Sequence, residues 1–141
     1  MSIEANKATV LRYFLESHNA PYNLDVMDET CSPAFAEGQK SWQRMERAAY
    51  PDKHFAIEDV VAEGDKVLLR WTIRGTHLGE FWTPVGTVSP TGKTITLTSM
   101  VLYRLVDGKI VEESGVHDWL SLLLQFGAEV RLPGREKDRA E

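Results

Sequence analysis

The stretch KTITLTSMVLYRLVDGKIVEESGVHD, residues 93–118, decides the fold of this chain. Two runs rich in Val, Ile, Leu, Thr and aromatic residues, 93–105 and 109–118, flank the pair Asp107-Gly108. Such runs favour β-strands, and Asp-Gly tolerates the positive φ of a tight turn. The stretch therefore predicts two long antiparallel strands joined by a hairpin.

Two further strands are predicted N-terminal to this hairpin, over residues 54–62 and 66–76, with Gly64-Asp65 as the turn between them. A strand of about 12 residues, at about 3.3 Å per residue, would be about 40 Å long if it were straight. A domain of this size cannot hold such strands flat. The sheet must therefore curl, and a curled sheet closed by helices encloses a pocket.

Helical patterns precede and follow the strands. The apolar spacing of residues 7–17 predicts an amphipathic helix, a short helix is expected after Asn23, and a third helix is expected from Ser41 until Pro51 ends it. The apolar run 119–126 predicts a short buried helix. Helices first and an antiparallel sheet second is the α+β pattern, with the helices on one face of the sheet.

Length and composition limit the classes of protein. The chain has 141 residues, so we expect a single domain over residues 1–128 and a flexible, charged tail over 129–141. The net charge of −5 argues against a nucleic-acid partner. A single cysteine, Cys31, with no signal-peptide pattern and no long apolar run, predicts a cytoplasmic protein that does not enter a membrane.

Motifs of metal, thiol, serine-nucleophile and dinucleotide chemistry are absent from the sequence. We therefore expect neither a metal nor a cofactor. The chemistry must then come from polar side chains that the strands place in the pocket.

Asp118 is the first candidate for a catalytic residue. It ends the last strand where the chain enters an apolar helix, and a carboxylate in an apolar pocket has a raised pKa and suits general acid/base catalysis. The alternative is a helix N-cap, a common role for Asp in this position. His77, at the start of the long loop 77–92, could donate a hydrogen bond to a developing oxyanion, or could only anchor the loop.

The register of the last hairpin decides which side chains accompany Asp118. A two-residue turn would place Asp118 on the face of Leu97 and Val101, whereas a three-residue loop over 106–108 changes the face. We favour the longer loop because Gly108 then takes the left-handed position. Three side chains would then line the pocket beside Asp118, namely Met100, Leu102 and Arg104.

The alternative for Arg104 is a solvated or subunit-facing surface of the sheet. His117 points to the opposite face from Asp118 and is expected to pack or to be exposed. Trp71, Trp82 and Tyr13 suggest an aromatic or otherwise flat apolar ligand, although Trp71 would suit the core equally well.

Several segments together resemble the SnoaL-like polyketide cyclase family. They include Gly75-Thr76-His77-Leu78-Gly79, Asp107-Gly108-Lys109, and Asp118 followed by 123–127. The resemblance covers residues 7–128. It implies the cone-shaped α+β barrel of the nuclear-transport-factor-2-like (NTF2-like) group, a homodimer, and cyclisation by an intramolecular aldol reaction without a cofactor. It also implies that Asp118 is the acid/base, and His77 matches the histidine of the family's Gly-x-His-x-Gly segment.

The sequence departs from the family at three places. Ser114 stands where many relatives have Trp, Arg104 stands where the cyclases have His, and the link 81–89 is longer than usual. We therefore expect a reshaped pocket. The prediction is a small-molecule cyclase in which Asp118 abstracts a proton, with His77 and Arg104 stabilising the enolate. The alternatives are an isomerase or hydrolase in the same pocket, or a non-catalytic protein that binds an apolar small molecule.

Overall fold

The computed structural model describes residues 2–134 of the chain. Its main sheet has four antiparallel strands in the order β1-β2-β5-β6. These strands are β1 (His54–Glu63), β2 (Lys66–Thr76), β5 (Thr94–Val106) and β6 (Lys109–His117). All four lie where the sequence predicts strands, and the α+β fold class is confirmed.

Three helices precede the sheet and one follows it. They are α1 (Ile3–His18), α2 (Val26–Thr30), α3 (Pro33–Ala49) and α4 (Trp119–Phe126). Ser2 caps α1, since its side chain accepts a hydrogen bond from the Ala5 amide. Gly127 ends α4 in the left-handed conformation, with a φ of 100°.

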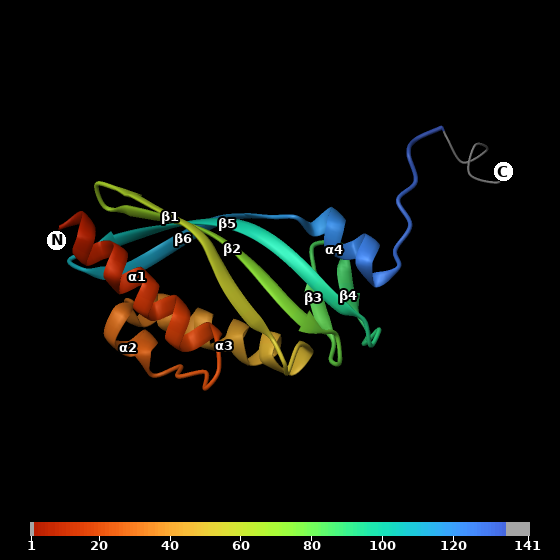
Figure 1. Cartoon of the computed structure of the whole chain (residues 1–141), viewed down its shortest axis with the longest axis horizontal. Helices are drawn as coiled ribbons and strands as arrows, with labels where there is room; N and C mark the ends of the chain where they lie inside the picture. The colour runs from red at the N-terminus through yellow and green to blue at the C-terminus, as the bar shows by residue number, and fades with distance from the viewer. Residues whose placement is uncertain (1, 135–141) are drawn as a thin grey trace.

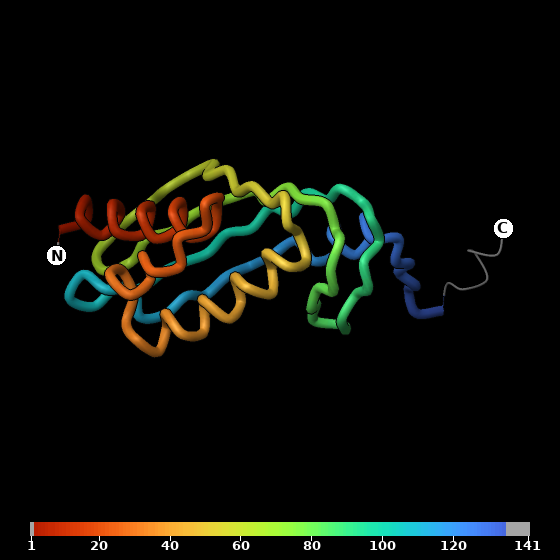
Figure 2. The backbone as a smooth tube through the Cα atoms, turned by 90° about the horizontal axis from the view of Figure 1, so that it is seen from below, coloured from red at the N-terminus to blue at the C-terminus, as the bar shows by residue number. Residues whose placement is uncertain are grey.

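The sheet is strongly curved and the N-terminal helices lie on its concave side. Figure 1 shows the strands arching over α1, α2 and α3, and Figure 2, from below, shows α1 and α3 apart from each other with strands visible between them. The inward side chains of β2 and β5 alternate with outward ones, and the inward set is buried. This arrangement gives the cone-like shape of the NTF2-like group.

The helix boundaries and the long loop differ from the sequence prediction. Helix α3 begins at Pro33, eight residues before the expected start at Ser41, because Ser32 caps it and Pro33 suits the first turn. The loop 77–92 contains a small hairpin, formed by β3 (Phe81–Thr83) and β4 (Gly86–Val88). This hairpin and α4 lie at the end of the molecule opposite the N-terminus (Figure 1).

The β5–β6 hairpin has a two-residue turn, so the predicted three-residue loop is wrong. Val106 pairs with Lys109, and Asp107 and Gly108 both have positive φ, at 49° and 77°. The register then shifts, because Arg104 pairs with Glu112 while Leu105 pairs with Ile110. Val111 is therefore an extra residue in β6, a β-bulge that moves every later side chain of the strand to the other face.

The predicted charged tail over 129–141 lies only partly within the described residues. Residues 129–132 form neither helix nor strand, and a turn follows at 133–134. The remainder of the predicted tail lies outside the described residues.

Candidate functional site

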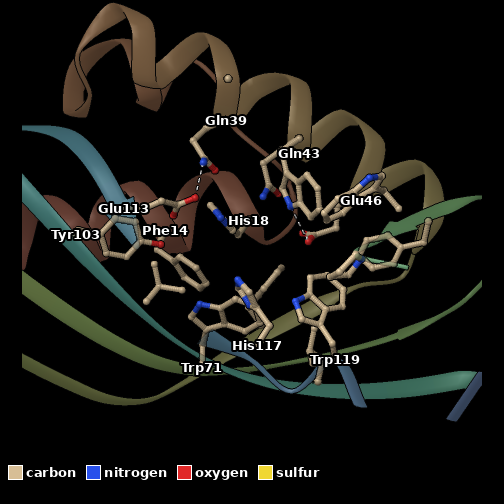
Figure 3. Close-up of a pocket in the computed structure, with 18 residues that line it drawn as sticks. Phe14, His18, Gln39, Gln43, Glu46, Trp71, Tyr103, Glu113, His117 and Trp119 are labelled. Atoms are coloured by element: carbon tan, nitrogen blue, oxygen red, sulfur yellow. Dashed lines mark hydrogen bonds between the residues drawn. The ribbon is translucent and has the colours of Figure 1, made fainter. Parts of the chain in front are cut away.

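A cavity of about 550 Å³ lies between α3 and the concave face of the sheet. Its walls come from both ends of the chain, including the end of α1, the β3–β4 hairpin and the start of α4. The side chains that matter below are Gln39, Gln43, Glu46, Trp71, Glu113 and His117 (Figure 3).

All four tryptophans of the chain line this cavity. Trp42 and Trp119 each lie edge-on to Trp82, with ring centroids 6.2 Å and 6.1 Å apart. Trp71 forms part of the floor and is 7% exposed. Large rings that contact one another at right angles give a rigid apolar wall against which a flat molecule can stack.

His117 comes from the inner face of β6 and points into the cavity (Figure 3). Its Nδ1 atom lies 2.6 Å from the Ser99 hydroxyl oxygen on β5, and its ring lies between Trp71 and Trp119, at 5.9 Å and 5.5 Å. Its Nε2 has no hydrogen-bond partner within residues 2–134. Nε2 is therefore the nitrogen that can exchange a proton with a ligand.

Burial of the His117 ring lowers its pKa, and the Glu46 carboxylate opposes this effect. The imidazole is therefore neutral at pH 7. When Nδ1 carries the proton, it donates a hydrogen bond to the Ser99 hydroxyl oxygen, and Nε2 then presents a lone pair to the cavity.

Trp71 adds a hydrogen-bond donor beside His117. Its indole Nε1 is buried and has no partner among the described residues. A buried N–H group without a partner is costly, and such a group in a cavity wall is a candidate donor for a bound molecule. The oxygen of a bound ligand would satisfy this donor.

A buried ion pair supports the wall formed by α3. The Lys53 ammonium lies 2.8 Å from Glu46 Oε1 and donates to Gln43 Oε1 at 2.5 Å. The Lys53 side chain is fully buried, and desolvation lowers its pKa. Since Lys53 holds the oxygen of Gln43, the Gln43 amide nitrogen is the end that remains for a ligand in the cavity (Figure 3).

A second acidic group, Glu113, lies on the inner face of β6 toward the other end of the cavity (Figure 3). Gln39 donates to Glu113 Oε1 at 2.7 Å, and the Tyr13 hydroxyl in turn donates to Gln39 at 3.2 Å. Desolvation by the surrounding protein raises the Glu113 pKa, and the Glu46 carboxylate raises it further.

His18 closes the cavity at the end of α1. Its ring stacks on Phe14 at 4.1 Å, and its Nδ1 lies 2.9 Å from the Ser17 hydroxyl. Burial lowers its pKa well below the usual value, and Lys53 lowers it further. His18 is therefore a neutral part of the wall.

Asp118 does not reach the cavity. Its carboxylate accepts a hydrogen bond of 3.1 Å from the Ser121 amide, so it caps α4, and the residue is exposed. The bulge at Val111 is the cause, because it turns His117 inward and Asp118 outward. The sequence prediction that Asp118 faces a low-polarity pocket is wrong for this structure.

The three side chains predicted to accompany Asp118 do share its face, but that face is the outer one. Met100 is 51% exposed and Leu102 is 36% exposed. Arg104 pairs with Glu112 on the same surface, with Nε and Oε1 2.5 Å apart. The solvated-surface alternative for Arg104 therefore describes its position.

His77 and Tyr13 also lie away from the cavity. His77 is fully buried beneath the long loop, where its Nδ1 accepts from the Thr91 amide at 3.2 Å and its ring packs on Phe126 at 4.4 Å. Burial lowers its pKa. His77 thus anchors the loop, as the alternative for this residue stated. Tyr13 is fully buried behind Gln39, whereas Trp71 and Trp82 line the cavity as predicted.

The polar residues of the cavity that the sequence prediction did not name include Gln39, Gln43, Glu46 and Glu113, and His117 was expected to pack or to be exposed. Glu113 and His117 alternate with Gly115 along β6, a spacing that places all three on one face of a strand. The helical spacing of Gln39, Gln43 and Glu46 is a second signal, since residues three and four apart share a helix face. Among residues 2–134, no group of three or more metal-ligating side chains occurs, and no helix is long and apolar enough to cross a membrane.

A curved sheet over helices with an aromatic cavity between them is the architecture of an NTF2-like α+β protein. The family model for SnoaL-like polyketide cyclases matches residues 18–126. The chain therefore belongs to the SnoaL-like polyketide cyclase family.

Solved structures agree with this assignment. A candidate SnoaL-like polyketide cyclase from Jannaschia sp. CCS1 is 25% identical, over 92% of this chain and 97% of its own, with a TM-score of 0.78. AclR, a candidate hydroxylase from Streptomyces galilaeus, is 26% identical over 99% and 91%, with a TM-score of 0.75. IdmH, a candidate polyketide cyclase from Streptomyces antibioticus, is 26% identical over 87% and 99%, with a TM-score of 0.70. Among curated proteins, none matches the chain.

Proposed function

We propose that this protein is a cofactor-independent cyclase that acts on a flat carbonyl compound by general acid/base catalysis, with His117 as the acid/base. The observation that carries the proposal is the His117 ring, whose Nδ1 is held by Ser99 while its Nε2 faces the cavity without a partner among the described residues. A neutral imidazole fixed in this way accepts a proton at pH 7.

The proposed reaction begins with abstraction of a proton from a carbon next to a carbonyl group. Nε2 of His117 takes the proton, and the Glu46 carboxylate stabilises the resulting imidazolium. The Trp71 N–H donates to the enolate oxygen, which satisfies its buried donor. The Gln43 amide is a second donor on the opposite wall.

The enolate carbon then attacks a second carbonyl carbon of the same molecule, and a new carbon–carbon bond closes the ring. The new alkoxide takes the proton back from Nε2 of His117, so the product is an isomer of the substrate. No electron is gained or lost. The aromatic walls favour this outcome because they restrict the conformations of a long substrate, so that the enolate carbon can approach the face of the second carbonyl group.

The proposal is tested by proton exchange on a simple ketone. In D2O, the protein should accelerate exchange of the α-protons of 2-tetralone, followed by NMR, because the first step needs only a carbonyl and an adjacent C–H. His117→Asn keeps a partner for Ser99 and removes Nε2, so exchange should fall by about 100-fold or more. His54→Asn is the matched control, since His54 is exposed at the start of β1.

Full exchange activity in His117→Asn would reject the assignment of His117. No acceleration by the wild type, together with tight binding of flat ketones, would favour the non-catalytic binding alternative. The isomerase and hydrolase alternatives use the same cavity, and one fold hosts several reactions, as the description of the relative AclR as a candidate hydroxylase illustrates.

We also propose that the chain acts as a cytoplasmic homodimer. The outer face of the sheet supports the dimer, because Met100 and Val116 pair across β5 and β6 and are 51% and 77% exposed. Exposed apolar side chains that lie side by side mark an interaction surface.

A further inference from the structure

The end of the cavity around Glu113 is not used by the proposed reaction. Glu113 and His117 are four residues apart on β6, so their Cα atoms are separated by about 13 Å at about 3.3 Å per residue. The carboxylate cannot reach the carbon from which His117 would take a proton. A ligand that extends from one group to the other would need at least two or three fused rings.

Glu113 also differs from Glu46 in its charge balance. Glu46 has a buried ammonium partner, Lys53, at 2.8 Å. Glu113 accepts from the neutral Gln39 amide at 2.7 Å, and the neutral Tyr103 hydroxyl, across the β5–β6 pair, also donates to it. No Lys or Arg occurs among the cavity-lining residues of the described chain. Glu113 is therefore an acidic group without a cationic counterpart there.

The hydrogen bonds around Glu113 fix its orientation. Tyr13 donates to the Gln39 oxygen, which leaves the Gln39 amide N–H pointing at Glu113. One carboxylate oxygen is thereby held, and the carboxylate can accept further hydrogen bonds from a ligand. An ionised carboxylate has no N–H or O–H group to donate, so it cannot hydrogen-bond a ligand group that only accepts, and its negative charge repels an anion.

We propose that the Glu113 end of the cavity is a subsite for a protonated amine on a flat, multi-ring ligand. This inference rests on the proposed function, since it names the substrate class of the same cavity. The aromatic walls are consistent with such a ligand, because the faces of tryptophan rings attract cations as well as stacking on flat rings. Carboxylates and phosphates are excluded by the same charge.

The test uses three matched anthracenes that differ only at position 9. They are 9-aminomethylanthracene, which is cationic at pH 7, 9-anthracenemethanol, which is neutral, and 9-anthracenecarboxylate, which is anionic. Binding is followed by energy transfer from the cavity tryptophans to anthracene and confirmed by calorimetry. We expect the cation to bind more tightly than the alcohol, and the carboxylate to bind at least about tenfold more weakly than the cation.

Glu113→Gln keeps the size and the Gln39 contact of the side chain and removes the charge, so it should abolish the preference for the cation over the alcohol. Glu112→Gln is the matched control, because the neighbouring Glu112 lies on the outer face with Arg104 and should leave all three affinities unchanged. The subsite is rejected if the carboxylate binds as tightly as the cation, or if Glu113→Gln keeps the wild-type preference.

The outcomes separate this inference from the proposed reaction. If the three anthracenes bind with equal affinity while His117→Asn still abolishes catalysis of proton exchange, the amine subsite is rejected and the proposed reaction stands. If no anthracene binds, both the subsite and the cavity as a ligand site are overturned.

Discussion

Lys53 holds two of the α3 side chains that line the cavity, Glu46 and Gln43, in place. Its ammonium is fully buried, lies 2.8 Å from Glu46, and also holds Gln43. Removing two charges from water lowers the folding stability by several kcal/mol. The attraction between Lys53 and Glu46 offsets this loss only while both side chains are present. Lys53 lies in the link between α3 and β1, directly before the strand, so its ion pair with Glu46 also connects the helix to the sheet.

Lys53→Met should therefore lower the free energy of unfolding by about 3–5 kcal/mol, because it leaves the buried Glu46 carboxylate without its partner. Urea unfolding followed by circular dichroism measures this loss. The control is Lys40→Met, which removes a more exposed ion pair with Asp28 and should cost about 0–1 kcal/mol. If Lys53→Met and Lys40→Met lowered the free energy of unfolding equally, the buried ion pair would contribute no more to stability than the exposed one.

The sequence allowed part of the site to be predicted at the residue scale. Trp71 and Trp82 could be proposed for the pocket because large aromatic residues favour apolar ligand sites. His117 was passed over although the alternation of β6 correctly separated it from Asp118. What the sequence could not reveal was which of the two faces the cavity, since one inserted residue reverses the answer.

At the scale of elements, strand β6 supplies two of the polar side chains of the cavity, Glu113 and His117. The bulge at Val111 turns Glu113, Gly115 and His117 inward on one row. The four long strands and α1 could be predicted because their periodicity is strong. Helix α4 was predicted from the apolar run 119–126, but Leu120 and Leu124 are exposed, so it is not the buried helix that was expected. The sequence does not reveal the early start of α3, because Ser41 is itself a suitable cap for a helix that begins later, whereas Ser32 caps the observed helix.

Gly115 leaves room for the His117 ring, and this gives a prediction about β6. A Cβ atom at position 115 would lie 3.1 Å from both His117 Nε2 and Val101 Cγ2. Gly115→Ala should therefore displace the ring and reduce proton exchange by about tenfold or more, because small misplacements of a catalytic group are costly.

The fold itself should survive Gly115→Ala, since alanine is less unfavourable than glycine in a strand and the atoms that must shift belong to the His117 and Val101 side chains. The circular dichroism spectrum and the unfolding midpoint check this. Unchanged exchange in a folded Gly115→Ala protein would contradict the role given to the His117 position. Gly92→Ala provides no such control because its φ is positive.

At the scale of the whole molecule, the curved sheet has two different faces. The concave face borders the cavity. On the convex face, the side chains of Met100, Leu102 and Val116 are exposed to solvent. Curvature was predictable from strand length alone, but the identity of each face was not, because both carry apolar residues. The charged pair of Arg104 and Glu112 lies beside this apolar patch.

The proposed homodimer predicts that Val116→Glu will produce monomers, because it places a charge in the middle of the apolar patch. Size-exclusion chromatography with light scattering measures the mass, for which one chain is 15.9 kDa. Val61→Glu is the control, since Val61 is also exposed but lies on β1, away from the β5–β6 patch. A wild-type protein that remains monomeric at high concentration would contradict the dimer.

The most direct test of His117 as the acid/base is a comparison of two neighbouring variants in the exchange assay, His117→Asn and Asp118→Asn. We predict that His117→Asn brings α-proton exchange of 2-tetralone close to the uncatalysed rate, while Asp118→Asn stays close to the wild-type rate, because asparagine also caps a helix. The reverse result, with activity lost in Asp118→Asn and kept in His117→Asn, would contradict the assignment of His117 and return the acid/base role to Asp118.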